Sequence, residues 1–329
     1  MQFPWILGAA EPVAPGIVIL LALAIDAAIA DPRALYRLVP HPVALIGRAV
    51  AIADDCLNRP RWGAAARVAA GLLSSVAVVV AATAVGWAVA ALARPLPGGW
   101  LILAVLASTL IAFRGLYDHV RAVAAGLETD LAAGREAVRH IVGRDPKGLD
   151  AAGVARAAIE SAAENFSDGV VAPVFWFALF GLPGLAGYKA VNTLDSMIGH
   201  RGARYERFGK AAARLDDAVN WLPARLAGGL IAAAALLVPG ARAGRALRAM
   251  LRDAPQHRSP NAGWSEAAMA GALGLALAGP RRYGDDLVDD AWMGDGRRDL
   301  GPADILAALR LYLVAGAALA GLIALTLPI

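Results

Sequence analysis

The chain has 329 residues, of which 58% are hydrophobic and only 18% are charged. Soluble domains are nearer to half apolar and a quarter charged, so this composition favours an integral membrane protein. Basic residues outnumber acidic ones by 31 to 27, and no basic run is interleaved with aromatic residues, which argues against nucleic-acid binding. The single cysteine, Cys56, excludes a disulfide framework within one chain.

Apolar runs recur along the chain at a length suited to crossing a bilayer. We predict spans at about 13–30, 68–93, 100–113, 170–187, 222–239 and 305–327. The run at 100–113 is short for a span, and Gly and Pro interrupt 170–187, which favours a kinked or re-entrant segment there. The predicted fold is all-α: one polytopic helical bundle over 1–329, with interfacial amphipathic helices and broken or re-entrant segments.

Arginine is distributed unevenly between the first two loops. The loop after the first run carries six arginines, whereas the link at 94–99 holds only Arg94 among Pro and Gly. Cytoplasmic loops favour Lys and Arg, so the first loop is predicted inside and the link outside. The segment 114–168 is then a cytoplasmic amphipathic segment. We expect two helices in it, the second capped by Asp150.

Three carboxylates at the end of that segment recur at four-residue spacing. On a helix, Glu160, Glu164 and Asp168 would share one face. Such a face is usually solvated, but the apolar stretch from Val170 leaves little water at this end. Several carboxylates close together at the membrane edge are unfavourable in free energy unless a cation binds among them. Mg²⁺ with phosphate oxygens would suit them.

The first apolar run is followed by Asp31-Pro32 and then by Pro40-His41-Pro42. Two prolines restrict the backbone on either side of His41 and so fix the direction of its side chain. A proline-braced helix exit explains this pattern as well as a functional histidine does.

Polar side chains also border the fourth predicted span. Asn192 and Asp195 lie three residues apart among apolar neighbours, and buried polar groups need partners. Lys189 would share a face with Asn192, although a lysine at a membrane edge often only extends its amine towards water.

Two later segments repeat this arrangement. Asp216 or Asp217 would share a helical face with Asn220 just before an apolar run, and Arg225 lies one turn inside that run, where it needs an anion. Further on, Asn261 stands near a helix start in a proline-rich loop. Backbone N–H groups there could bind a phosphate, but ordinary capping explains the pattern equally well.

The chain has no Walker-type loop and no Gly-x-Gly-x-x-Gly motif.

Taken in chain order, these five segments resemble the adenosylcobinamide-phosphate synthase family of cobalamin biosynthesis (CobD/CbiB). The likeness covers nearly the whole chain from about Asp26. The matching pieces are Asp31-Pro32 with His41-Pro-Val, Glu160-Ser-x-x-Glu-Asn-x-x-Asp-Gly169, Lys189-Ala-Val-Asn-Thr-Leu-Asp-Ser-Met197, Arg214-Leu-Asp-Asp-x-x-Asn220 with Leu222-Pro-Ala-Arg225, and Ser259-Pro-Asn-Ala-Gly-Trp264. Phe166-Ser167 and His200 depart from the usual family pattern without removing a charged position.

The resemblance implies an ATP-dependent ligase that joins adenosylcobyric acid to (R)-1-aminopropan-2-yl phosphate, or a related amino alcohol, and gives adenosylcobinamide phosphate. ATP and Mg²⁺ would be its cofactors. Its partners would be the corrinoid and amino alcohol substrates, the lipid bilayer and other cobalamin-assembly enzymes. It would be a multi-pass protein of the bacterial inner membrane with its site facing the cytoplasm.

The same resemblance suggests roles for individual residues. Candidate catalytic residues are Glu160, Glu164, Asp168, His41 and Asp195. Candidate substrate or phosphate ligands are Lys189, Asn192, Arg201, Arg204, Asn220, Arg225 and Asn261. Candidate Mg²⁺ ligands are Glu164, Asp168, Asp216 and Asp217. Either a carboxylate or His41 would take the proton from the attacking ammonium.

Two other classes of function fit the same residues. One is a Mg²⁺-dependent membrane transferase acting on a diphosphate or phospho-alcohol, which would need no ATP. The other is a non-enzymatic membrane component, such as a transporter subunit or a scaffold for neighbouring enzymes.

Overall fold

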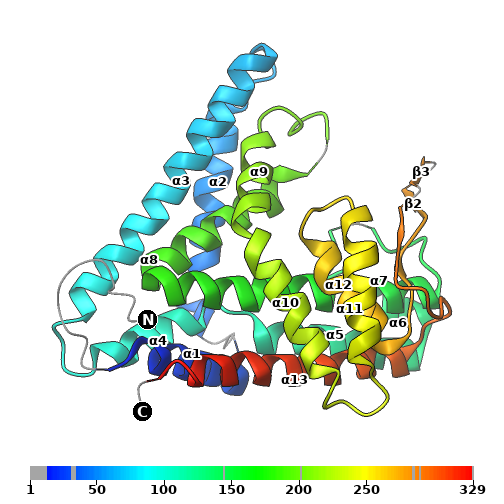
Figure 1. Cartoon of the computed structure of the whole chain (residues 1–329). Coiled ribbons are helices and arrows are strands. Elements are labelled where there is room, and N and C mark those ends of the chain that lie inside the picture. Colours follow the sequence, from blue (N-terminus) through cyan, green and yellow to red (C-terminus); the bar gives the residue numbers. More distant parts are fainter. Residues whose placement is uncertain are drawn as a thin grey trace. The chain divides into compact units, whose positions relative to one another are not determined.

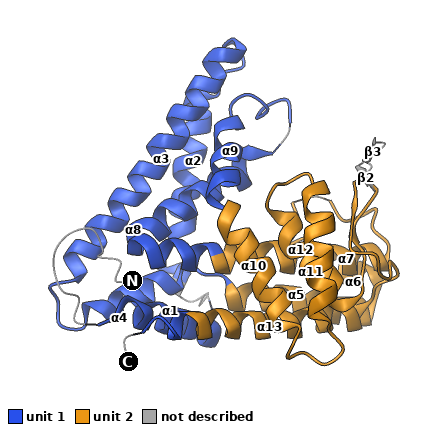
Figure 2. Cartoon of the chain, in the orientation of Figure 1, with its two compact units in different colours: residues 1–112, 172–220, 323–329 blue, residues 113–171, 221–322 orange. Residues whose placement is uncertain are grey.

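The computed structural model describes residues 13–30, 35–143, 145–200, 202–283, 286–288 and 290–327. The chain divides into two compact units, coloured separately in Figure 2. Unit 1 comprises residues 1–112, 172–220 and 323–329, and unit 2 comprises residues 113–171 and 221–322.

Helices make up nearly all of the regular structure in both units (Figure 1). Unit 1 contains α1 (Pro15–Ile29), η1 (Leu35–Arg37), α2 (Pro42–Leu57), α3 (Ala64–Ala93), α4 (Gly99–Ser108), α8 (Ala172–Leu194), η3 (Asp195–Gly199) and α9 (Lys210–Val219). Unit 2 contains α5 (Phe113–Thr129), α6 (Leu131–Val138), α7 (Ala151–Phe166), η2 (Ser167–Val171), α10 (Trp221–Ala234), α11 (Ala243–Asp253), η4 (Ala254–Gln256), α12 (Ala262–Leu273) and most of α13 (Pro302–Ala324).

Strands occur only as short pairs in the part of unit 2 that the structure describes. β1 (Leu277–Ala278) pairs antiparallel with β4 (Trp292–Met293), and β2 (Arg281–Tyr283) pairs antiparallel with β3 (Asp286–Val288). No sequence pattern predicted these strands, because two or three residues are too few for a period-2 pattern. The predicted all-α class is nevertheless confirmed.

Among the residues that the structure describes, four helical stretches are long and apolar enough to cross a membrane: Ala64–Ala93, Gly99–Thr129, Ala151–Gly199 and Pro302–Ala324. Two shorter apolar helices, Pro15–Ile29 and Trp221–Ala234, match other predicted runs. Large apolar side chains on α3, such as Leu73, Val80 and Val85, are exposed, as lipid-facing residues are in a membrane protein. The protein is therefore a polytopic membrane protein, while the limits of each span and the single-domain assignment stay predictions.

α8 is broken where the sequence suggested a kink. Gly181 has φ +65° and ψ −155°, which no helical residue adopts, and Pro183 follows two residues later. A side chain at position 181 would be strained in this conformation, so glycine is needed to turn the chain there. The predicted broken segment is confirmed.

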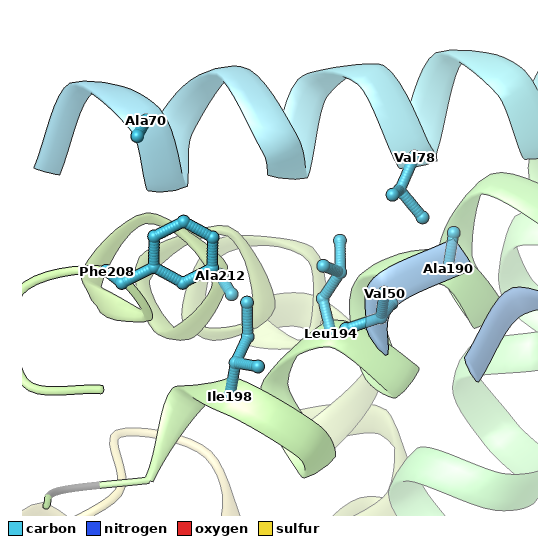
Figure 3. Close-up of a cluster of buried hydrophobic side chains, with 8 residues drawn as sticks. All are labelled: Val50, Ala70, Val78, Ala190, Leu194, Ile198, Phe208 and Ala212. Carbon is cyan, nitrogen blue, oxygen red and sulfur yellow. The ribbon is translucent and has the colours of Figure 1, made fainter. Parts of the chain in front are cut away.

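A cluster of buried apolar side chains lies within unit 1. Side chains from α2, α3, α8, η3, α9 and the segment before α9 meet there (Figure 3). They are Val50, Ala70, Val78, Ala190, Leu194, Ile198, Phe208 and Ala212. This packing brings segments that are distant in sequence together around α3.

The amphipathic segment before residue 168 forms three helices, α5, α6 and α7, where two were expected. Asp130 interrupts the first expected helix, because its side chain accepts a hydrogen bond from the N–H of Ala133 (2.7 Å) and starts α6. Asp150 accepts one from the N–H of Gly153 (2.7 Å), as an N-cap does. The prediction that Asp150 begins the last of these helices is confirmed.

α7 ends at Phe166 and continues as a π-helical turn, η2. A π turn contains more residues than an α turn and is often found at functional sites. The regular four-residue spacing that joins Glu160 to Glu164 therefore ends before Asp168.

Candidate functional site

Unit 2 contains a cavity of about 390 Å³ that is lined by acidic side chains. Its walls come from α7, α12, β1, the segment after α6, the loop after η4 and the segment before β4. The lining residues are Ile141, Val142, Gly143, Ala157, Glu160, Ser161, Glu164, His257, Arg258, Glu266, Ala278 and Asp290. Four carboxylates thus share the described wall with one arginine and one histidine, so cations are favoured there.

Glu160 ties α7 to the first strand. Its Oε1 accepts a hydrogen bond from the N–H of Ala278 at 2.7 Å, and the residue is 7% exposed. Ala278 has φ +57°, an unusual value for a residue with a side chain. Such strain often lies at functional sites, and here the Glu160 carboxylate helps to hold it in place.

Two polar residues next to Glu160 fix the adjoining wall. The Ser161 hydroxyl donates to the carbonyl oxygen of Ile141 at 2.9 Å, which ties α7 to the segment after α6. The side-chain amide of Asn165 donates to the carbonyl oxygen of Ser161 at 3.0 Å. Glu164 lies one turn beyond Glu160 and is exposed at the cavity wall.

A histidine and a glutamate of the cavity wall lie next to each other. His257 Nε2 lies 3.7 Å from Glu266 Oε2, and their side chains are 19% and 6% exposed. The N–H of Ser259 donates to His257 Nδ1 at 3.0 Å, which holds the ring. The Ser259 hydroxyl in turn accepts from the N–H groups of Asn261 and Ala262, both at 3.2 Å, and so caps the start of α12.

The close approach of this loop to α12 requires a glycine at position 263. A Cβ there would lie 2.6 Å from the His257 Cβ and 2.8 Å from the carbonyl oxygen of Ala254. Both distances are shorter than real carbon contacts allow. Gly263 thus lets the His257 loop lie directly against α12.

Asp253 anchors the segment after β4 to the end of α11. Its Oδ2 accepts hydrogen bonds from the Gly294 N–H and from Arg252 Nη2, both at 2.8 Å. Arg252 Nη1 also donates to Asp295 Oδ2 at 2.9 Å, and this guanidinium holds the pKa of Asp295 below its ordinary value. At the cavity itself, Arg258 forms an ion pair with Asp290.

Unit 1 brings a second group of predicted residues together. The buried Asn220 accepts a hydrogen bond at its Oδ1 from the Tyr188 hydroxyl at 3.0 Å. Asp195 and Asp217 are near enough for their charges to interact, and Arg214 Nη1 lies 3.5 Å from Asp217 Oδ2. The segments around α8 and α9 therefore do converge within this unit.

Other predicted residues of unit 1 have local partners. Lys189 is 8% exposed, and its carbonyl oxygen accepts a hydrogen bond from Thr193 Oγ1 at 2.6 Å. The carbonyl oxygen of Asn192 accepts one from Ser196 Oγ at 2.9 Å. His41 caps α2, because its Nδ1 accepts a hydrogen bond from the Val43 N–H at 3.1 Å.

Arg204 contacts a buried carboxylate. Its Nη2 and Nε donate to Asp54 Oδ2 at 2.7 and 3.2 Å, and the Tyr205 hydroxyl donates to the same oxygen at 3.1 Å. Asn58 Nδ2 donates to Asp54 Oδ1 at 2.8 Å. Burial alone would raise the pKa of Asp54, but these hydrogen bonds outweigh it and hold the pKa below its ordinary value.

Arg225 is stacked between two indoles of unit 2. Its guanidinium carbon lies 4.1 Å from the ring centroid of Trp221 and 4.4 Å from that of Trp264. Of the remaining predicted residues, Asn261 is buried beside the start of α12. Asp31, Pro32 and Arg201 lie outside the described residues.

The candidate Mg²⁺ ligands are divided between the units: Glu164 and Asp168 belong to unit 2, and Asp216 and Asp217 belong to unit 1. Within the described ranges, no three His, Cys, Asp or Glu side chains form a group that could hold a metal. Mg²⁺ commonly uses one or two carboxylates together with water and substrate phosphates. The donor set of the unit 2 cavity fits that mode of binding, in which Glu160 and Glu164 would hold the ion jointly with a phosphate.

Comparison with known proteins places this chain in a family. The model of the family described as "CobD/Cbib protein" matches residues 19–312, which is most of the chain. The chain belongs to the CobD/CbiB family. The family resemblance drawn from the five sequence segments is therefore confirmed.

Curated CobD/CbiB relatives match along nearly their whole length. A protein of Rhodobacter capsulatus is 50% identical over 296 residues, covering 89% of this chain and 91% of its own. Proteins of Brucella suis (90% and 92% coverage) and Rhizobium meliloti (91% and 93%) are each 48% identical. All three are named "Cobalamin biosynthesis protein CobD". No solved structure matches the chain.

Four ionisable residues of the unit 2 cavity were not among the predicted site residues: His257, Arg258, Glu266 and Asp290. The first three stand in a segment that the sequence marked only by its prolines and its capping pattern. The available sequence signal for these residues was a run of polar residues between two prolines, directly before a helix of small residues. Its position opposite Glu160 follows only from the packing of α7 against α12.

Proposed function

We propose that this CobD/CbiB protein acts in cobalamin biosynthesis as an ATP-dependent amide synthase. It would join the free carboxylate of adenosylcobyric acid to the amine of (R)-1-aminopropan-2-yl phosphate, or of a related amino alcohol, and release adenosylcobinamide phosphate. The observation that carries the proposal is whole-length similarity to proteins named for cobalamin biosynthesis. The acid-lined cavity of unit 2 supports it.

The cavity suits the two requirements of amide-bond formation. The substrate carboxylate must first be activated as a phosphoryl or adenylyl ester, and the amine must then lose a proton before it attacks. Glutamates such as Glu160 and Glu164 attract an ammonium and would hold Mg²⁺ together with phosphate oxygens. When bound, Mg²⁺ would supply positive charge to the phosphates of ATP.

The reaction also suggests a location. A multi-pass protein that consumes ATP would lie in the bacterial inner membrane with its site facing the cytoplasm, where ATP is present. The arginine-rich first loop, which the charge rule places inside, supports this orientation. Association with other cobalamin-assembly enzymes would shorten the path of the corrinoid between them.

The test is nucleotide turnover by the purified full-length protein in lipid vesicles. An amide synthase consumes ATP only when both the corrinoid acid and the amine are present. Release of ADP and phosphate would indicate a phosphoryl ester, and release of AMP and diphosphate an adenylyl ester. A membrane transferase would form product without ATP, and that outcome would reject the proposal.

A further inference from the structure

The proposed amide synthesis requires a group that removes a proton from the amine. A primary alkyl amine resembles the lysine side chain, whose pKa is about 10.4, so it arrives as an ammonium at neutral pH. Only the free amine carries the electron pair that attacks an activated carboxyl carbon. A base in the site therefore has to act before the C–N bond forms.

We propose that Glu266 accepts this proton and that His257 positions Glu266 to do so. This inference rests on the proposed function. Both residues lie in the wall of the unit 2 cavity, on different elements: Glu266 on α12 and His257 in the loop after η4. Their facing atoms, Oε2 and Nε2, are 3.7 Å apart, within reach of electrostatic attraction or of one bridging water.

Backbone contacts assign the proton of the histidine ring. The N–H of Ser259 donates to His257 Nδ1 at 3.0 Å, so that nitrogen is an acceptor. The Ser259 carbonyl oxygen, 3.2 Å from the same nitrogen, would be its partner only if Nδ1 carried the proton. The shorter N–H contact favours the neutral ring with its proton on Nε2, the atom facing Glu266. His257 is then a donor towards the carboxylate and does not compete with it as a base.

The other carboxylates of the cavity are less suited to this role. Glu160 already accepts a backbone hydrogen bond from the Ala278 N–H at 2.7 Å, which ties its carboxylate to β1. Asp290 is already engaged in an ion pair with Arg258. Glu164 is exposed, whereas the Glu266 side chain is 6% exposed and its Oε2 lies 3.7 Å from His257 Nε2. Glu266 is thus the carboxylate of this wall that a histidine ring can position.

The chemical step balances without a further reactant. Glu266 takes one proton from the ammonium, and the freed electron pair forms the C–N bond to the activated carboxyl carbon. The C–O bond to the phosphoryl or adenylyl group breaks, and the leaving group departs with that electron pair. The departing phosphate takes the second proton from nitrogen, and Glu266 returns its proton to water.

The first experiment compares two nucleophiles in the full-length protein. Glu266→Gln keeps the size of the side chain and removes the base, so turnover with the amino alcohol should fall about 10²–10³-fold at neutral pH. Hydroxylamine is largely unprotonated at that pH and needs no base. ATP-dependent hydroxamate formation from the corrinoid acid should therefore be retained by the variant.

The pH profile gives a second readout. Without the base, turnover should follow the fraction of free amine and rise about tenfold per pH unit, whereas the unmodified protein should reach a plateau. The titratable and charged groups that face Glu266 across the cavity are Glu160 and Glu164 of α7, His257 and Arg258 of the loop, and Asp290.

Chemical rescue gives a third readout. Formate should restore part of the activity of the Glu266→Ala variant, because a formate ion can occupy the space left by the carboxylate and act as the base.

The histidine is tested with a matched pair of variants. His257→Asn keeps an acceptor for the Ser259 N–H, since asparagine commonly binds the N–H two residues on, but it removes the donor facing Glu266. Turnover should fall about tenfold, as for other residues that orient a functional group. The control is His140→Asn, which removes a surface histidine 3.8 Å from Glu136 and should leave turnover unchanged.

The outcomes separate this inference from the proposed function. If the unmodified protein forms no ATP-dependent hydroxamate or amide, the proposed function fails. If it does, and Glu266→Gln loses hydroxamate formation as fully as amide formation, the residue serves activation or folding and the inference is overturned. Full amide turnover by Glu266→Gln, or an unchanged pH profile, would overturn it as well.

Discussion

Two buried carboxylates, one in each unit, differ in what surrounds them. Asp54 of unit 1 is 7% exposed and accepts hydrogen bonds from Arg204, Asn58 and Tyr205. Glu266 of unit 2 is 4% exposed and lies in the wall of an acidic cavity. A carboxylate surrounded by donors of its own chain stabilises the fold, whereas one that faces a cavity can meet a substrate. Burial by itself does not distinguish the two.

The comparison also bears on Arg204, a predicted phosphate ligand. Its guanidinium donates twice to Asp54 Oδ2, which links the segment before α9 to α2. Because those two nitrogens are occupied, the structure offers Arg204 a stabilising role. Its predicted role towards phosphate stays a prediction.

The largest expected effect concerns Glu164 near the end of α7 and Asp168 in η2. The double variant Glu164→Gln/Asp168→Asn should lose at least about 10²-fold in corrinoid amidation, because it removes a carboxylate of the cavity wall, Glu164, together with Asp168 of the following turn. Membrane insertion and the unfolding midpoint should change little, since Glu164 is exposed and Asp168 half-buried. Product formation in vesicles measures the first quantity, and thermal unfolding of the purified protein measures the second. Normal amidation by this variant would exclude the acidic face from the mechanism and favour a scaffold.

The opposite pattern is expected for Asp54. Asp54→Ala leaves the donors of Arg204, Asn58 and Tyr205 without their shared acceptor, so the free energy of unfolding should fall by about 2–3 kcal/mol. Tyr205→Phe removes one of these bonds and should cost about 1 kcal/mol. Denaturant unfolding in detergent measures both. A large loss of activity in Asp54→Ala without a loss of stability would show that the comparison is wrong.

A third prediction concerns the packing of the His257 loop against α12. Gly263→Ala places a methyl group 2.6 Å from the His257 Cβ, and the resulting displacement should cost about 1–2 kcal/mol of unfolding free energy. Activity should fall as well, because His257 moves relative to α12. The control is Gly229→Ala on α10, where a Cβ would meet nothing within 4 Å. Equal behaviour of the two variants would contradict the close packing.

The smallest expected effect is a dependence of stability on pH. The pKa of Asp54 is lower in the folded protein than the unfolded value of about 3.9, so its ion pair contributes fully above that value. This contribution is lost as the pH falls through the lowered pKa. Asp54→Asn should therefore unfold with a weaker dependence on pH below about 4. An identical acid transition in both proteins would contradict the role of this carboxylate.

Much of the architecture could be predicted from local patterns. The apolar runs predicted α1, α3 and α13, Asp150 predicted the start of α7, and the Gly and Pro of α8 predicted its break. These features depend on neighbours in sequence, so local reasoning reaches them. The division of 114–168 into three helices was missed, because Asp130 does not differ locally from other acidic residues on an exposed helical face.

The candidate site was predicted only in part. Glu160 and Glu164 were identified by their spacing, and both line the cavity. Asp168 lies within the π-helical turn η2, which the sequence does not reveal. Asp195 and Asp217 were both candidates from the sequence, and within unit 1 their charges interact.

The amino-acid sequence by itself determined the membrane class, the helical fold and the family, because composition, hydropathy and motif order are properties of the chain. Only the tertiary structure decided which acidic residues share a cavity and which form internal ion pairs. Glu160 and Ala278 are 118 residues apart, and Asp54 and Arg204 are 150 apart. Contacts over such separations arise from the packing of whole helices, and no local pattern encodes them.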